Sequence, residues 1–264
     1  MSKIASLFIS HGSPDIALAD TAASEFLRRY AQDLPRPEAI VVVSAHFEAG
    51  GVAVTGDAKP QTIHDFGGFS DELYKIRYEA PGCPALAGRI ACMMQEAGLA
   101  AGVVQNRGFD HGTWVPLSLM YPQADIPVVQ VSVDPHAGPV HHFKIGRSLE
   151  PLRNENILVI GSGSMTHNLK EALAALRDGE RCAAVPPWVA KFAQWMEKRI
   201  ASSDTEALLA YRQRAPYAVD NHPTEEHLLP LFSAVGAAGD SWNGSKIHAS
   251  MDFGVLAMDA YAFN

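Results

Sequence analysis

The chain has 264 residues, enough for one large α/β domain or two small ones. Hydrophobic residues make up 47% of the sequence, and the formal net charge is −8. An acidic chain without clustered lysine and arginine argues against a nucleic-acid surface, because phosphate binding needs concentrated positive charge. Three cysteines without CxxC spacing argue against a disulfide framework and against a zinc–thiolate centre.

The sequence gives only coarse indications of the cellular compartment of the protein and of its association with membranes or other chains. No apolar run reaches the roughly 20 residues that a membrane span requires, so we expect no membrane association. The sequence passes from Met1-Ser2-Lys3 directly into a strand-like run, so no signal peptide is expected. Together with the cysteine pattern this indicates the cytoplasm. A homo-oligomer is compatible with the sequence.

Predicted strands and helices alternate along the chain. The strands are expected at 4–10, 39–44, 126–133 and 156–160, with a weaker one at 245–253. The helices are expected at 17–31, 84–97, 140–152, 169–176 and 188–201. This alternation is typical of βαβ units, so we predict an α/β fold in three layers, with a central, mainly parallel or mixed sheet flanked by helices. No linker is evident, and residues 1–264 are interpreted as a single domain.

Histidines follow three of the predicted strands. His11 and His46 closely follow the first two strands, and His167 follows the fourth across a Gly-Ser-Gly-Ser turn. Parallel strands end at one edge of a sheet, where α/β proteins bind ligands. Imidazoles collected there are typical of a metal site with acid–base partners. The alternatives are that His11 and His167 cap the helices that follow them and that His46 is a core residue.

A fourth histidine stands at a predicted loop-to-helix junction. His111 directly follows Asp110 and precedes a helix that contains residues 115–120. Asp110 either orients a neighbouring imidazole or caps that helix.

A second junction lies between His222 and His227. It is typical of a helix start, because a proline follows His222 and acidic residues follow the proline. Glu226 and His227 offer two kinds of metal ligand side by side, and only one of two adjacent helical residues normally faces a site.

The remaining polar segments indicate a functional site less strongly. The loop at 64–69, His-Asp-Phe-Gly-Gly-Phe, is typical of a lid or a pocket wall. His136, His141 and His142 flank a predicted helix start, and we expect them to face solvent. The sequence contains no dinucleotide fingerprint, P-loop or G-x-S-x-G elbow, so no motif supports a nucleotide-binding or serine-hydrolase function.

Taken in order, these motifs resemble those of the class III extradiol ring-cleavage dioxygenases, the protocatechuate 4,5-dioxygenase beta-subunit-like superfamily. Within it, the chain looks most like the single-chain bacterial and plant group of 4,5-DOPA extradiol dioxygenases. Several ordered motifs together are more specific than one His-Gly-Ser turn. The matching segments span nearly the whole chain: 10–14, 44–46, 63–69, 108–112, 167–169 and 223–227.

The resemblance implies a metal site and its acid–base partner. His11, His46 and His227 would be the metal ligands, with Glu226 as the alternative to His227. His167 would be the catalytic acid–base and could also coordinate zinc when no substrate is bound.

The resemblance also implies residues around the substrate. His111 would be a second catalytic residue near bound oxygen or substrate. His64, Asp65 and Asp110 would contact the substrate.

The implied reaction is insertion of both atoms of O2 into a catechol, DOPA-like or otherwise substituted, at a mononuclear non-haem metal. Two histidines and one further side chain on one face of a metal leave three positions open, two for catechol oxygens and one for O2. The need for electron transfer favours Fe(II), whereas Zn(II) could fill the same site without redox activity.

Two alternatives stay open at this point. One is a metal-binding relative without dioxygenase activity. The other is a tetrapyrrole metal chelatase, which also begins with a strand followed by His-Gly-Ser. A chelatase leaves His46, His167 and the Glu226-His227 pair without a role.

A further hypothesis concerns the substrate. Lys75, Arg77 and Arg107 lie near the predicted pocket loops and could pair with a carboxylate, which would favour a catechol with a polar or charged side chain. The alternative is that all three are solvated surface charges.

Overall fold

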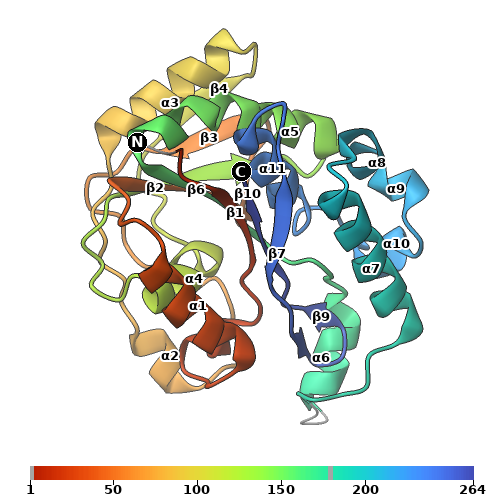
Figure 1. Ribbon diagram of the computed structural model, residues 1–264. Helices are drawn as coiled ribbons and strands as arrows, with labels where there is room; N and C mark the ends of the chain where they lie inside the picture. The colour runs from red at the N-terminus through yellow and green to blue at the C-terminus, as the bar shows by residue number, and fades with distance from the viewer. Residues whose placement is uncertain (1–2, 178–180) are drawn as a thin grey trace.

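The computed structural model of the protein describes residues 3–177 and 181–264 (Figure 1). Within those residues the central sheet has eight strands in the order β4-β3-β5-β2-β6-β1-β10-β7, and β8 and β9 form a separate pair. The strands are β1 (Ser6–Ser10), β2 (Ala39–Glu48), β3 (Val52–Thr55), β4 (Ala101–Val104), β5 (Val128–Val133), β6 (Ile157–Gly163), β7 (Gly244–His248), β8 (Met251–Asp252), β9 (Leu256–Ala257) and β10 (Ala260–Phe263).

The sheet is mixed, with a parallel centre. β5, β2, β6 and β1 are parallel neighbours. On one side β10 pairs antiparallel with both β1 and β7, and on the other β3 pairs antiparallel with β5 and parallel with β4. The predicted α/β class with a mainly parallel or mixed sheet between helices is confirmed.

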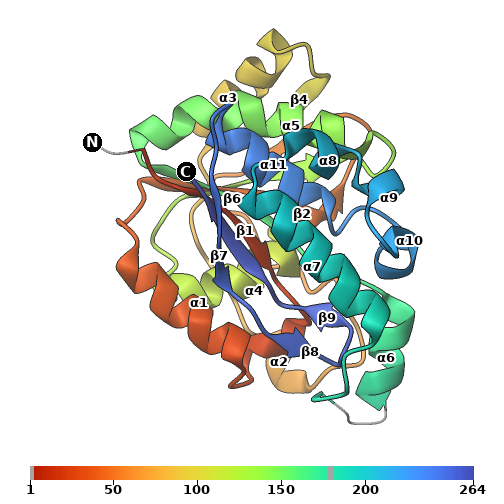
Figure 2. The ribbon, with the colours of Figure 1, turned by 45° about the vertical axis from the view of Figure 1, so that its right-hand side comes forward.

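Helices cover both faces of the sheet. α1 and α4 pack on one face, and α3, α5 and α11 pack on the other, which gives three layers (Figures 1 and 2). The helices are α1 (Ala22–Asp33), α2 (Asp71–Lys75), α3 (Pro84–Glu96), α4 (His111–Met120), α5 (Gly138–Leu149), α6 (Leu169–Arg177), α7 (Pro187–Ala201), α8 (Thr205–Leu209), α9 (Tyr211–Arg214), α10 (Ala218–Asn221) and α11 (Leu229–Ala238), with 3-10 turns η1 (Pro14–Ala17) and η2 (Glu150–Glu155). Among the described residues, no helix is both long and apolar enough to cross a membrane.

Strand β2 shows why the centre of the sheet is so apolar. Ile40 and Val42 are buried with α1 and α4, whereas Val41 and Val43 are buried with α3, α5 and α11. Successive side chains of a strand point to opposite faces, so a strand covered on both faces must be hydrophobic at every position. This is the physical basis of the uninterrupted β-branched run in the sequence.

The predicted strands and helices are found with shifted ends. β2 continues past the expected end at Ser44 to Glu48, and its pairing with β5 shifts between Val43 and Glu48. His46 therefore lies within the strand rather than after it. The weak strand predicted at 245–253 is divided between β7 and β8.

The helix start expected after His222 is wrong. Residues 223–228 form bends and a turn, and α11 begins at Leu229 with Pro230 in its first turn. His227 consequently lies in the turn that leads into α11. Its backbone carbonyl accepts a hydrogen bond from the Ser164 amide at 2.8 Å, which ties this turn to the end of β6.

The solvent-facing prediction is also wrong for His142. His136 is exposed, but His142 is fully buried on the inner face of α5. Its Nδ1 donates to the Gly138 carbonyl at 2.7 Å, and its Nε2 accepts from the Asp134 amide at 3.1 Å. Both ring nitrogens are thereby satisfied inside the protein, which makes burial of a polar ring tolerable.

Candidate active site

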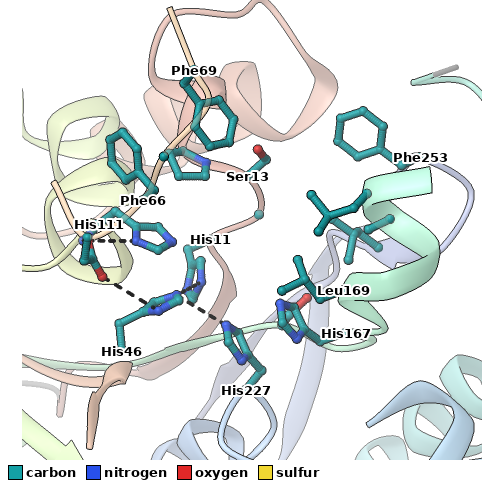
Figure 3. A pocket seen from close by; sticks show the side chains of 18 residues that line it. His11, Ser13, His46, Phe66, Phe69, His111, His167, Leu169, His227 and Phe253 are labelled. Atoms are coloured by element: carbon teal, nitrogen blue, oxygen red, sulfur yellow. Dashed lines mark hydrogen bonds and ion pairs between the residues drawn. The ribbon is translucent and has the colours of Figure 1, made fainter. Parts of the chain in front are cut away.

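Five histidines line one cavity of about 310 Å³ at the carboxyl ends of the central strands (Figure 3). They come from five separate segments of the chain. His11 follows β1, His46 lies near the end of β2, His111 is the first residue of α4, His167 precedes α6, and His227 precedes α11.

The register of three strands explains why two of these side chains meet. β6 lies between β2 and β1, and it aligns Ser162 with Ser44 and Gly163 with Ser10. His11 and His46 therefore emerge at the same edge of the sheet on either side of β6. This agrees with the expectation that parallel strands deliver their ligand-binding groups to one edge.

Three imidazole nitrogens converge closely enough to hold one metal ion. His46 Nε2 lies 3.0 Å from His11 Nε2 and 3.3 Å from His227 Nε2, and all three atoms lie within 4.8 Å of one another. Nitrogens bound at about 2.1 Å to a single tetrahedral or octahedral metal are themselves roughly 3.0–3.4 Å apart. The donor set fits a first-row transition metal.

The protonation state of the three rings also fits metal binding. Burial, reinforced by the neighbouring histidines, lowers the pKa of His11, His46 and His227 well below the usual value. These rings are therefore neutral at pH 7. A neutral imidazole offers a lone pair to a metal, whereas a protonated one does not.

Hydrogen bonds to the outer nitrogens select the tautomer of two of these rings. The Ser162 hydroxyl donates to the Gly112 carbonyl, so its oxygen accepts from His11 Nδ1 at 3.0 Å. Glu226 Oε1 accepts from His227 Nδ1 at 2.9 Å. Because each proton is placed on Nδ1, each Nε2 keeps a free lone pair directed into the site.

Asp65 links the two histidines on the other side of the site. Its Oδ1 accepts from both the backbone amide and the Nδ1 of His111, at 3.0 and 2.9 Å, and its Oδ2 lies 3.8 Å from His46 Nδ1. Burial by itself raises the pKa of this carboxyl, but the hydrogen bonds and charge of His111 outweigh burial and lower the pKa to about 2. Asp65 is therefore ionised at neutral pH.

His167 stands apart from the nitrogen cluster but touches it. Its ring stacks on that of His227 with centroids 3.5 Å apart and planes inclined by 8°. Burial, followed by the charge of His111, lowers the pKa of His167 to about 4. A neutral His167 beside the cavity can accept a proton from a bound molecule.

Two glycines allow the chain to pack this closely. A Cβ on Gly112 would lie 2.7 Å from Ser44 Oγ and 3.0 Å from His46 Cδ2. A Cβ on Gly163 would lie 2.1 Å from the His227 carbonyl oxygen. Both positions bring backbone against a proposed ligand, which only glycine permits without displacement.

The rest of the cavity wall is largely apolar. Phe66 and Phe69 of the loop at 64–69 form one side, so this loop is a pocket wall as expected. Leu169 of α6 and Phe253, between β8 and β9, lie on the opposite side (Figure 3).

Comparison with known proteins agrees with this arrangement. The profile of a family described as the catalytic LigB subunit of aromatic ring-opening dioxygenase matches residues 7–263. The chain belongs to this dioxygenase family. Dioxygenases of this LigB type use a metal and act on a small aromatic molecule and O2. The chain is thus an extradiol ring-opening dioxygenase.

Individual relatives extend the similarity over nearly the whole length. A protein of Beta vulgaris named 4,5-DOPA dioxygenase extradiol is 41% identical over 97% of this chain and 95% of its own length. A protein of Escherichia coli K12 with the same name is 38% identical over 92% of this chain and 87% of its own. The crystal structure of an uncharacterized E. coli K12 protein superposes with a TM-score of 0.81 at 31% identity, covering 98% of this chain and 99% of that one. None of these relatives supports the chelatase or the non-enzymatic alternative.

Two residues expected to contact substrate in this dioxygenase do not line the cavity. Asp110 is fully buried and caps α4 by accepting from the Thr113 amide at 3.1 Å, while the Ser44 hydroxyl donates to it at 2.7 Å. His64 lies behind the loop, where its Nε2 donates to the Ile76 carbonyl at 3.2 Å. Of the three residues predicted to contact substrate, only Asp65 reaches the cavity.

The three cations proposed to pair with a substrate carboxylate also lie elsewhere. Lys75 pairs with Glu72, and Arg77 donates to the backbone carbonyls of Tyr74 and Ile76. Arg107 donates to the His46 carbonyl at 3.0 Å and to the Asp110 carboxylate at 3.2 Å. The hypothesis that they bind a charged side chain of the substrate is therefore not supported by the structure.

Sequence reasoning missed several residues of the site. The tautomer-fixing role of Ser162 could have been suspected from the polar Gly-Ser-Gly-Ser segment before His167, although its first three residues belong to β6 and not to the expected turn. Leu169 and Leu173 are large apolar residues one turn apart on α6, so their shared face was a usable signal. Phe253 is brought to the cavity by the C-terminal strands, and nothing in its local sequence indicated that position.

Proposed function

We propose that the protein cleaves a substituted catechol with Fe(II) held by His11, His46 and His227. One observation carries this proposal: the Nε2 atoms of three buried, neutral histidines converge on one side of a cavity large enough for a substituted ring. The relatives named 4,5-DOPA dioxygenase extradiol make a DOPA-like catechol a candidate substrate.

Glu226 is the residue that we propose to exclude from the ligand set. It accepts a hydrogen bond from His227 Nδ1, and the Thr224 hydroxyl donates to it at 3.0 Å. Glu226 therefore orients and polarises His227, as carboxylates do behind many metal-bound histidines.

Fe(II) bound to the three nitrogens would supply a redox-active centre with open positions for both catechol oxygens and for O2, chemistry that Zn(II) in the same nitrogens cannot supply. His167, neutral at pH 7, accepts the proton that a catechol hydroxyl loses on binding and returns it when the ring opens. The apolar walls limit access of water to the reacting ring.

His111 is proposed to hold a hydrogen-bonding position toward oxygen or substrate. Asp65 fixes the ring by accepting from Nδ1, so that Nε2 is the nitrogen available to the cavity. The proposed groups span positions 11 to 227, and residues from both ends are needed to complete the site. This supports residues 1–264 as a single catalytic domain.

The test is to remove bound metal, rebuild the protein anaerobically with Fe(II), and admit O2 in the presence of L-DOPA, protocatechuate, catechol or 4-propylcatechol. We expect stoichiometric O2 uptake and a yellow ring-opened product with at least one of these catechols. Protein loaded with Zn(II) is the matched control and should consume no O2. Full Fe(II) occupancy without O2 uptake on any catechol would contradict the proposal.

A further inference from the structure

We propose that the cavity selects catechols whose ring substituent is uncharged and apolar, in preference to those that carry a carboxylate. This inference rests on the proposed function and names the class of substrate for the same site. It reverses the earlier hypothesis of a polar or charged side chain.

Two leucines at the cavity wall are exposed, which favours an apolar occupant. Leu169 and Leu173 of α6 are 54% and 45% exposed, although both line the cavity. Phe66 and Phe69 lie across the cavity from Leu169, and Phe253 lies on the same side as Leu169 (Figure 3). Exposed apolar side chains on facing walls gain free energy when an apolar group fills the space between them.

The charged side chains of the cavity wall disfavour a substrate carboxylate. In the described part of the chain, no lysine or arginine lines the cavity, and Asp65 is the one carboxylate that does. The hydrogen bonds from His111 keep Asp65 ionised. A substrate carboxylate would therefore meet the Asp65 carboxylate and no lysine or arginine in the described wall.

Two arginines that contact cavity-lining residues are already paired with acids. Arg181 lies over the ring of Phe253 at 5.0 Å, but it donates to Asp15 at 2.8 Å and lies 3.8 Å from Asp252. Arg107 is likewise held by buried Asp110. Redirecting either arginine to a substrate would leave a carboxylate without its partner, which is costly away from bulk water.

The experiment compares probes of similar length that differ in charge. With Fe(II)-loaded protein, kcat/KM is measured for 4-propylcatechol, 3-(3,4-dihydroxyphenyl)propanoate and L-DOPA. We expect 4-propylcatechol to exceed both carboxylates by about tenfold or more, because a buried charge without a partner is poorly tolerated. Calorimetric titration of the Zn(II)-loaded protein, which does not turn over, should give the same ranking of Kd.

A variant that adds a positive charge tests the cavity wall itself. Leu173→Lys places a cation at an exposed position of the wall, and we expect it to raise kcat/KM for the propanoate by about tenfold while lowering that for 4-propylcatechol. Val140→Lys is the matched control. Val140 is 64% exposed on α5 and does not line the cavity, so this change should leave the ratio unaltered.

The outcomes separate the two proposals. Turnover of the propanoate or of L-DOPA as fast as 4-propylcatechol would overturn the apolar-substituent inference and leave ring cleavage intact. The same inference fails if Leu173→Lys leaves the ratio unchanged. Absence of O2 uptake with every catechol would contradict the proposed function, and the Kd ranking would then still decide the preference of the cavity.

Discussion

At the scale of single residues, each converging imidazole depends on the group behind it. His11 is fixed by Ser162, His227 by Glu226, and His46 faces Asp65 at 3.8 Å. The group behind the ring is a hydroxyl for His11 and a carboxylate for His227 and His46. Loss of such a partner typically reduces metal affinity by 10- to 100-fold, less than the loss of a ligand.

Glu226 provides the sharpest test of this division. Glu226→Ala should weaken Zn(II) binding by about 10- to 100-fold, because His227 loses the acceptor that fixes its tautomer. Glu226→Gln keeps an acceptor oxygen, so its Zn(II) affinity should fall less than that of Glu226→Ala. His227→Ala should lose more than either. Competition titration with a chelating dye measures all three, and equal loss in Glu226→Ala and His227→Ala would make Glu226 a ligand instead.

His11 and His167 should separate metal binding from proton transfer. His11→Ala removes one of three converging nitrogens, so we expect metal content to fall to near zero. His167→Ala should keep the metal and lose turnover by about 10²- to 10⁴-fold, the usual contribution of a general acid–base. Elemental analysis alongside O2 uptake distinguishes the two. Equal loss of metal in both variants is the result that contradicts the assignment.

At the scale of elements, the close approach of α4 to β2 positions His46. Gly112→Ala would place a Cβ 2.7 Å from Ser44 Oγ and 3.0 Å from His46 Cδ2, so the first turn of α4 or the His46 ring must move. We expect a lower Tm and a Zn(II) affinity reduced by about tenfold or more. Gly88→Ala is the control, because nothing lies within 4 Å of its Cβ. Gly88 is inside α3, so that change should stabilise the protein by about 0.5–1 kcal/mol. Equal effects of the two changes would show that crowding at His46 is not the cause.

Sequence patterns predicted the parallel centre of the sheet because its strands are buried on both faces and are therefore mostly apolar, with few buried polar residues such as Gln130 and Ser132. They failed where distant contacts override local preference. Residues 223–228 have the composition of a helix start, yet His222 Nε2 donates to the Met165 carbonyl at 3.0 Å and the His227 carbonyl accepts from Ser164. These contacts join segments about 60 residues apart, and they keep residues 223–228 in a turn, so that α11 begins only at Leu229.

The same limit applied to the site. The five cavity histidines were recognisable because each stands at a strand end or a junction. Asp110 caps α4, one of the two roles left open by its sequence, whereas the substrate contact implied by the resemblance could not be judged locally, because the partners that enclose its carboxylate, Ser44 and Gln130, come from β2 and β5. Of the cavity walls, the loop at 64–69 was predicted, whereas Phe253 was hidden because it comes from the far end of the sequence.

At the scale of the whole molecule, buried neutral histidines make stability depend on pH. Burial lowers the pKa of His142 to about 4, against about 6.5 in the unfolded chain. The unfolded state therefore binds the proton more readily than the folded state below pH 6.5. Stability from this residue is complete above pH 6.5 and is lost as pH falls toward 4, by about 1.4 kcal/mol per pH unit.

Urea unfolding of metal-free protein between pH 7.5 and 4.5 measures this effect. His142→Gln cannot protonate, so its free energy of unfolding should fall less steeply below pH 6.5 than that of the unchanged protein. His136→Gln is the control, because His136 is exposed. An identical slope in His142→Gln and the unchanged protein would show that His142 does not titrate on unfolding in this range.

The position of β10 has a consequence for biosynthesis. This strand, formed by Ala260–Phe263, lies between β1 and β7 and pairs along β1, the strand that leads to His11. A nascent chain that has emerged from the ribosome only as far as residue 227 already carries His11, His46 and His227, but β1 has no neighbour on one side. Domains of this kind complete their long-range pairings late. The side chains proposed to bind the metal are therefore synthesised before β10 can complete the sheet beside β1, and we expect stable metal loading to follow translation.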